Sequence, residues 1–150
     1  MSIELNYLLL VRILLTLTTL GYSLVTVMVD FNATHATNPK WTPHARFHLV
    51  WQISSYLGFG LLALSLIWWP GPLTLERLYL AAAMATIVYI GFFVAFFAMP
   101  HYGGGTYDDN GYLPFRAPIS LFGEKWDVNV TAFCIHVMLL AVAVLTLIAN

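Results

Sequence analysis

Two histidines stand one helical turn apart at the start of an apolar segment of this sequence. His44 and His48 are followed by Gln52, and a spacing of four residues places all three near one face of a helix. Two imidazoles one turn apart can grip a metal ion or pass a proton between them. The segment lacks the glutamate of the His-Glu-x-x-His protease motif. A third interpretation also stays open, in which both rings bond loop carbonyls at a membrane edge.

Other polar side chains are expected to approach this pair. Asp30 ends an earlier apolar segment, while Asn129 and His136 lie seven residues apart, hence on one face of the last segment. Ionisable groups within a membrane normally face the bundle interior or a water-filled cavity. We therefore expect these groups to converge. The predicted catalytic residues are Asp30, His44, His48 and His136. The predicted substrate-binding residues are Gln52, Asn129, Trp51 and Tyr89.

A metal ion is the one cofactor to which these residues point. Its ligands would be His44 and His48, with a third from Asp30, His35 or His136. A pair of histidines alone supplies only half of a typical zinc site. The sequence therefore leaves open whether the site holds a metal.

The segments that carry these residues are long and apolar. Of 150 residues, 60% are hydrophobic and 9% are charged, whereas a soluble domain has roughly a quarter of its residues charged. A helix needs about 20 apolar residues to cross the hydrocarbon of a bilayer, and it satisfies its own backbone hydrogen bonds there. Four segments qualify: residues 7–29, 44–69, 75–99 and 128–148. The sequence predicts an all-α membrane protein, a four-transmembrane-helix bundle forming a single domain over residues 1–150.

The connections between these segments are unequal. A Pro-Gly-Pro turn at 70–72 joins the second and third segments, whereas residues 30–43 and 100–127 form long polar loops. With four spans, both termini and the short turn lie on one side of the membrane, and both long loops lie on the other. We expect the long loops to act as lids. Thr42 is expected to cap the second helix, with Pro43 at its first position.

A polar stripe follows the first segment at spacings of three and four residues. Hydroxyl groups in membrane helices commonly bond their own backbone or join helices, so packing is the expected role of most of these residues. Arg12 lies near enough to the helix end to extend its charge toward water, whereas Asp30 needs a partner or water. The stripe consists of Arg12, Thr16, Thr19, Ser23, Thr26 and Asp30.

Charge and cysteine content exclude some classes of function. The net charge of −1 gives no basic field for nucleic acid, and the single Cys134 excludes an internal disulfide. The first segment lacks a basic leader and is too long for a signal peptide, so we expect a retained helix. Basic residues favour cytoplasmic long loops, but acidic residues crowd the same side, so orientation stays open. The expected partners are the lipid bilayer and a small lipophilic molecule; a homo-oligomer or larger membrane complex also stays open.

Residues 38–48 carry the pattern N-P-x-W-x-P-H-A-R-F-H. Together with the residues just before it, this stretch resembles the signature of a family of small four-helix membrane proteins of bacteria and fungi. The resemblance covers about the first half of the chain. Because no activity is established for that family, the resemblance carries over no catalytic role. It implies that the loop and the start of the second helix act as one unit.

These residues support three hypotheses about function. The leading one is a membrane-embedded enzyme that performs acid/base chemistry, such as isomerisation or cyclisation, on a small lipophilic substrate. The second is a histidine-ligated, metal-dependent membrane enzyme at the same site. The third is a non-enzymatic accessory subunit of a larger membrane complex, with its polar loops buried against a partner and no enclosed cavity.

Overall fold

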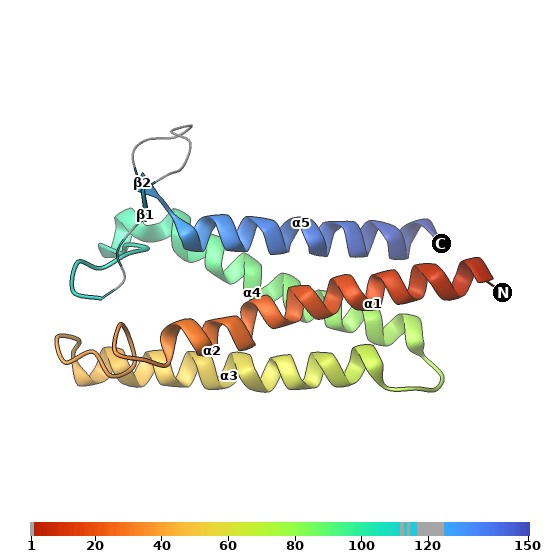
Figure 1. Ribbon diagram of the computed structural model, residues 1–150, viewed down its shortest axis with the longest axis horizontal. Helices are drawn as coiled ribbons and strands as arrows, with labels where there is room; N and C mark the ends of the chain where they lie inside the picture. The colour runs from red at the N-terminus through yellow and green to blue at the C-terminus, as the bar shows by residue number, and fades with distance from the viewer. Residues whose placement is uncertain (1, 112, 114, 117–124) are drawn as a thin grey trace.

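The computed structural model describes residues 2–111, 113, 115–116 and 125–150 (Figure 1). Within this part of the chain, helices provide nearly all of the regular structure. They are α1 (Ser2–Tyr22), α2 (Leu24–Asp30), α3 (Pro43–Trp68), α4 (Thr74–Tyr102) and α5 (Val128–Ala149). Two short strands, β1 (Phe115–Arg116) and β2 (Lys125–Trp126), pair antiparallel between α4 and α5.

Four helical segments are long and apolar enough to cross a membrane. They are Tyr7–Asp30, Pro43–Trp68, Thr74–Tyr102 and Val128–Ala149. Both long loops lie at one end of the bundle, and both termini lie with the short turn at the other end (Figure 1). The predicted fold class, an all-α four-helix membrane bundle with two long loops on one side, is confirmed.

The first span, predicted over 7–29, is divided at Ser23 into α1 and α2. Ser23 has φ −104° and ψ −76°, and its hydroxyl donates a hydrogen bond of 2.7 Å to the carbonyl of Thr19. A side chain that bonds the carbonyl one turn earlier often bends a helix. Gly60 of α3 lies directly against this point, where a Cβ would overlap the Ser23 side chain. From the bend onward, α2 runs along α3 (Figure 1).

The helices pack most closely in the half of the bundle that ends at the short turn. There α1 contacts α3, α4 and α5, and small side chains on α4 let the backbones approach. At the loop end, α2 stays against α3, while α4 packs with α5 (Figure 1). The buried residues of the packed half include Val11, Leu15, Ala63, Ile67, Leu78, Ala81, Ala82, Ala85, Ala143 and Leu147.

Arg77 holds the short turn between α3 and α4. Its guanidinium donates hydrogen bonds to the carbonyls of Pro72 at 2.5 Å, Trp69 at 3.0 Å and Gly71 at 3.2 Å. The end of a helix leaves carbonyls without helical partners, and Arg77 supplies donors to this region. This cation therefore has a structural role in the turn.

The polar stripe of the first helix also has a structural role at this end. Trp68, at the end of α3, donates its indole N–H to the hydroxyl of Thr16 at 2.9 Å. The guanidinium of Arg12 lies 5.7 Å from the centre of the Trp68 ring, within range of a cation–π interaction. These contacts attach α1 to α3 near the short turn.

The helix ends largely follow the predictions. Thr42 caps α3 by accepting the N–H of Ala45 at 3.2 Å, with Pro43 at the first helical position, as predicted. Helix α4 continues through Pro100 to Tyr102, beyond the predicted end at 99. A proline in the last turn costs little because the helix stops at Gly103, whose φ of 68° is the left-handed conformation that glycine adopts easily.

Gly60 and Gly58 provide a matched test of the contact that bends the first span. Gly60→Ala should lower the free energy of unfolding by about 1–3 kcal/mol, because the new methyl group overlaps Ser23. In Gly58→Ala, on the same helix, the new methyl group meets nothing within 4 Å, so this substitution should raise the free energy of unfolding by up to about 1 kcal/mol. Unfolding in mixed detergent–SDS micelles measures both values. Equal effects of the two substitutions would contradict a tight contact at position 60.

Candidate functional site

A cavity of about 600 Å³ lies between the helices at the loop end of the bundle. This volume is within the range of pockets that bind small molecules. All of the membrane-spanning segments contribute to its walls, together with residues of both long loops. The apolar part of the wall consists of Val25, Val29, Leu49, Phe92, Ala95, Phe96, Met99, Val128, Ala132 and Phe133. The cavity thus offers a mostly apolar surface inside the membrane-spanning region.

Four of the predicted site residues line this cavity: Asp30, Gln52, Asn129 and His136. They come from three different spans, so the tertiary structure brings together groups that are distant in sequence. Tyr89 lies behind the wall, and the other three predicted residues lie outside the cavity. Those three are His44, His48 and Trp51.

His136 is held in one orientation at the deep end of the cavity. Its Nδ1 lies 2.7 Å from the carbonyl oxygen of Ala132. Because a carbonyl only accepts, Nδ1 carries the hydrogen, and the lone pair of the neutral ring is on Nε2. Gly21 lies so close to the ring that a Cβ there would overlap it. The position of the ring thus depends on the absence of a side chain at residue 21.

Tyr89 supports His136 from behind, although it was predicted to bind substrate. The two rings stack with their centres 6.2 Å apart and an angle of 11° between their planes. The Tyr89 hydroxyl donates a hydrogen bond of 2.7 Å to the carbonyl of Thr18, and the residue is 2% exposed. Tyr89 is therefore a positioning residue behind the cavity wall.

Asp30 and His35 lie beside each other at the loop end of the cavity. Nδ1 of His35 lies 3.9 Å from Oδ1 of Asp30, which makes an ion pair when the imidazole is protonated. The same Nδ1 lies 2.7 Å from the hydroxyl of Thr34. The chain turns back here because the N–H of Ala36 donates to the carbonyl of Asp30 at 3.1 Å. Sequence reasoning named His35 only as a possible metal ligand.

The signal for His35 was present in the sequence. Asn32 begins a turn after the helix end: its amide donates to the carbonyl of Val29 at 2.6 Å and its side-chain oxygen accepts the N–H of Thr34 at 2.8 Å. Asparagine and threonine commonly fix such turns through their side chains. A turn at this point folds His35 back toward Asp30.

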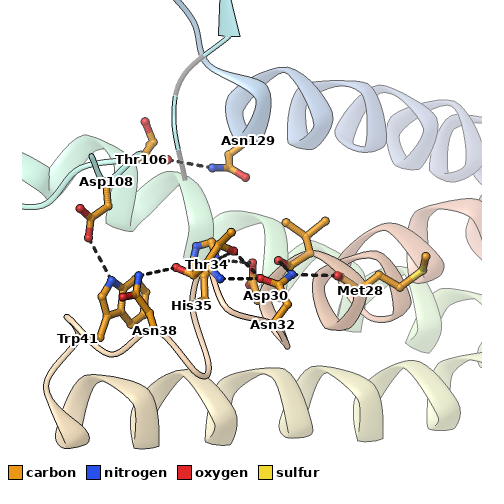
Figure 2. A network of polar contacts seen from close by, with 11 residues as sticks. Met28, Asp30, Asn32, Thr34, His35, Asn38, Trp41, Thr106, Asp108 and Asn129 are labelled. Atoms are coloured by element: carbon orange, nitrogen blue, oxygen red, sulfur yellow. Dashed lines mark hydrogen bonds and ion pairs between the residues drawn. The ribbon is translucent and has the colours of Figure 1, made fainter. Parts of the chain in front are cut away.

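The two long loops are joined by hydrogen bonds (Figure 2). The Trp41 indole N–H donates to Asp108 at 3.0 Å. The Asn38 amide donates to the carbonyl of Asn110 at 3.0 Å, and Lys40 donates to the side chain of Asn110 at 2.8 Å. Asn38 is 1% exposed. Conspicuous polar residues of the 38–48 pattern therefore hold the loops together.

Asn129 connects α5 to the second of these loops. Its amide nitrogen donates to the carbonyl of Thr106 at 3.0 Å (Figure 2), and the hydroxyl of Thr106 donates to Asp127. Asp127 also caps α5 by accepting the N–H of Val130 at 2.9 Å. Asn129 thus positions the loop at the cavity wall, besides lining the cavity as a predicted substrate-binding residue.

A second cavity of about 470 Å³, here called the vestibule, lies among the loops. Its walls include Trp41 from the first loop and Asp108 from the second. Three residues line both the vestibule and the larger cavity: His35, Gly105 and Thr106. His35 therefore stands between a space formed by polar loops and a space formed by apolar helices.

His44 and His48 lie on the exposed face of α3, and their Nε2 atoms are 3.0 Å apart. Trp51 is 61% exposed beside them. A helix turns by about 100° per residue, so each step of four residues overshoots a full turn by about 40°. From Gln52 back to His44 the side-chain direction thus changes by about 80°, which carries the histidines away from the cavity.

The predicted third metal ligand does not join this pair. Among the residues that the structure describes, no group of three or more His, Cys, Asp or Glu side chains is placed to hold a metal ion. Asp30, His35 and His136 all lie at the cavity, which His44 and His48 do not line. The structure thus separates the acid/base groups of the cavity from the exposed histidine pair.

Comparison with known proteins gives no match among family models, curated proteins or solved structures. The resemblance of residues 38–48 to a family of small membrane proteins stays a prediction. The cavity and its side chains are therefore the basis for inferring a function.

Asp108 provides a test of the loop contacts through their pH dependence. The backbone N–H of Asn110, followed by the indole of Trp41, holds the pKa of Asp108 below its ordinary value. A carboxyl group whose pKa is lowered by folding stabilises the folded loops at pH values above its ordinary pKa of about 4. This stabilisation is lost as the pH falls through the lowered pKa. Hydrogen exchange of residues 31–42, relative to intrinsic rates, should therefore accelerate below about pH 4.

The neighbouring aspartate is the matched control for this experiment. In the Asp108→Asn variant, the amide hydrogens of residues 31–42 should exchange faster than in the wild type at neutral pH. Their exchange should also show much less acceleration in acid. Asp109→Asn changes an exposed residue beside it and should behave like the wild type. The same exchange profile in Asp108→Asn and the wild type would contradict the assigned loop contact.

Proposed function

We propose that this protein binds a small lipophilic molecule in the cavity and catalyses proton transfer on it, as isomerases and cyclases do. One observation carries the proposal: Asp30 with His35, and His136, line a single cavity whose other walls are largely apolar. Apolar walls favour a lipophilic ligand, and these side chains are the types that donate and accept protons in enzymes. Lipid around the spans is a direct source of such a ligand.

The two proton-transfer groups have different surroundings. His136 has its Nδ1 hydrogen committed to Ala132, so Nε2, on the ring edge beside Gly21 in the cavity wall, is the ring atom left to exchange a proton. Asp30 is about one fifth exposed and has His35 beside it. When Asp30 carries a proton, its carboxyl group is the acid, and the neutral imidazole of His136 is the base, that a proton shift on one ligand requires.

The distance between these groups favours cyclisation over a short double-bond shift. Asn129 and His136 are seven residues apart along α5, which corresponds to about 10 Å. The end of α2, where Asp30 stands, and the start of α5, where Asn129 stands, both lie at the loop end of the bundle (Figure 1), so Asp30 and His136 are separated along the bundle axis. In such a cyclisation, an alkene gains a proton at one end, the cation closes a carbon–carbon bond, and another carbon loses a proton. The molecular formula is unchanged.

Aromatic side chains lie between the two ends of the cavity. Phe92 and Phe133 stack with their ring centres 3.9 Å apart, and Phe96 stacks on Phe92 at 6.3 Å. All three line the cavity. Aromatic faces attract cations, so these rings are suited to stabilise positive charge on a ligand that extends past them.

The two alternatives have less support. A metal-dependent enzyme at this site requires a third ligand near His44 and His48, and the described residues place none there. An accessory subunit would bury its polar loops against a partner and have no enclosed cavity. The loops here instead bond to one another, as Trp41 does to Asp108, and they adjoin a cavity.

Solvent deuterium provides the test of proton transfer. Vesicles containing the protein are incubated in D₂O buffer with an organic extract of membranes from the expressing cells, and the extract is analysed by mass spectrometry. We expect at least one lipophilic compound to gain deuterium only when the protein is present. Asp30→Asn and His136→Gln should each reduce this gain by at least about 100-fold, the usual loss when an acid or base is removed.

His48→Gln is the matched control, because His48 lies at the same end of the bundle but outside the cavity. This variant should keep wild-type deuterium incorporation. Folding of each variant is checked by circular dichroism in detergent. Protein-dependent incorporation that survives both cavity substitutions would refute the proposed site, and the absence of any incorporation would refute the proposed chemistry.

His35 is expected to return protons between Asp30 and water in the vestibule, since it lines both spaces. His35→Ala should slow deuterium incorporation into the compound identified above, and imidazole added to the buffer should restore part of the rate. If His35 has only a structural role, deuterium incorporation by His35→Ala should be slow and added imidazole should not increase its rate. His136→Gln serves as the comparison, because a free imidazole should not replace a ring held against Gly21.

A further inference from the structure

We propose that His44 and His48 form a binding site for a divalent transition-metal ion, with Cu²⁺ as the preferred ion. The site lies on the exposed face of α3, outside the cavity, and does not depend on the proposed function. Two imidazoles supply the protein ligands, and water completes the coordination. The inference rests on the geometry of the pair, its exposure and the capped helix start that carries it.

The distance between the two rings fits one ion. The Nε2 atoms are 3.0 Å apart, and the ring centres are 4.4 Å apart. An imidazole nitrogen binds a first-row metal at about 2.0–2.1 Å. Two nitrogens 3.0 Å apart, each at that distance from one ion, subtend an angle of about 90–97° at the metal. In the structure the two nitrogens share a hydrogen bond. A metal ion would replace its hydrogen, and a rotation of the two side chains would direct both lone pairs at the ion.

This angle favours Cu²⁺ over Zn²⁺. Zinc sites in proteins are usually tetrahedral, with ligand angles near 109°, whereas Cu²⁺ takes square-planar or tetragonal arrangements with neighbouring ligands near 90°. Imidazole is a good ligand for Cu²⁺, and Cu²⁺ has the highest affinity among the divalent first-row metals for a given nitrogen site. The two histidines thus match two adjacent equatorial positions of a copper ion.

The structure at the start of α3 fixes the backbone that carries His44 and His48. Thr42 caps the helix and Pro43 fixes the backbone at its first position, so His44 stands in an ordered turn. The spacing of four residues places His48 one turn further along the same side of the helix, as a neighbour of His44. Both residues are exposed at the loop end of the span, where water can provide the remaining ligands. No third donor is required for a site of this open type.

Trp51 provides a spectroscopic reporter. Its ring centre lies 5.9 Å from that of His48, and the side chain is 61% exposed. Bound Cu²⁺ quenches the fluorescence of nearby tryptophans. Copper at the pair should therefore reduce the emission of Trp51, and Trp51→Phe should remove that part of the response while leaving the affinity unchanged.

The experiment uses the full chain without an affinity tag, in detergent, titrated with CuSO₄. Calorimetry should give one Cu²⁺ ion per chain at the strongest site, and electron paramagnetic resonance should show coupling to two imidazole nitrogens. His44→Ala and His48→Ala should each weaken binding by at least tenfold. His101→Ala, which removes another exposed histidine from α4, should bind as the wild type does. Zn²⁺ should bind more weakly than Cu²⁺.

Several outcomes would overturn the assignment. Equal copper affinity in His48→Ala and the wild type would exclude the pair as the site, as would coupling to a single imidazole nitrogen. Zinc binding as tight as copper binding would refute the preference for tetragonal geometry. Circular dichroism of each variant confirms that α3 remains folded, so that a loss of affinity reports the loss of a ligand.

Discussion

The contact between Ser23 and Gly60 determines the shape of this bundle. Ser23 bends the first span by bonding back to Thr19, and Gly60 provides the space that lets α2 lie against α3. The half of the bundle near the short turn remains closely packed around small side chains. At the other end α2 and α3 diverge from α4 and α5, and the cavity lies between them (Figure 1). The bend thus lies where the packed half of the bundle gives way to the cavity.

The loops above the cavity meet a different constraint. Polar groups that the loops bury, such as the side chain of Asn38, need hydrogen-bond partners, and they find them in the other loop. Asn38 and Trp41 of one loop bind Asn110 and Asp108 of the other. The same residue types serve in catalysis, which is why a sequence pattern rich in them invites a catalytic interpretation. Here Asn38 and Trp41 of the pattern join the two loops, and His35, just before the pattern, reaches the cavity.

The candidate site could be predicted only in part. Asp30, Gln52, Asn129 and His136 line one cavity, as convergence of polar groups inside a bundle predicts. His44, His48 and Trp51 were expected beside them because a four-residue spacing looks like a single face. The 40° excess at each step rotates that face away over two turns. Residues spaced by four turn gradually around the helix axis, and their spacing alone does not determine which of them face the neighbouring helix.

Hydropathy by itself determined that this chain forms four membrane-spanning helices with two long loops at one end, because the lipid solvent acts on each segment independently of the others. Local chemistry also determined the cap at Thr42. Only the tertiary structure decided that the bend of the first span lies against Gly60, and that Gly21 admits the ring of His136. Each of these depends on the rotation of helices or on contacts between residues distant in the sequence, which no local pattern specifies.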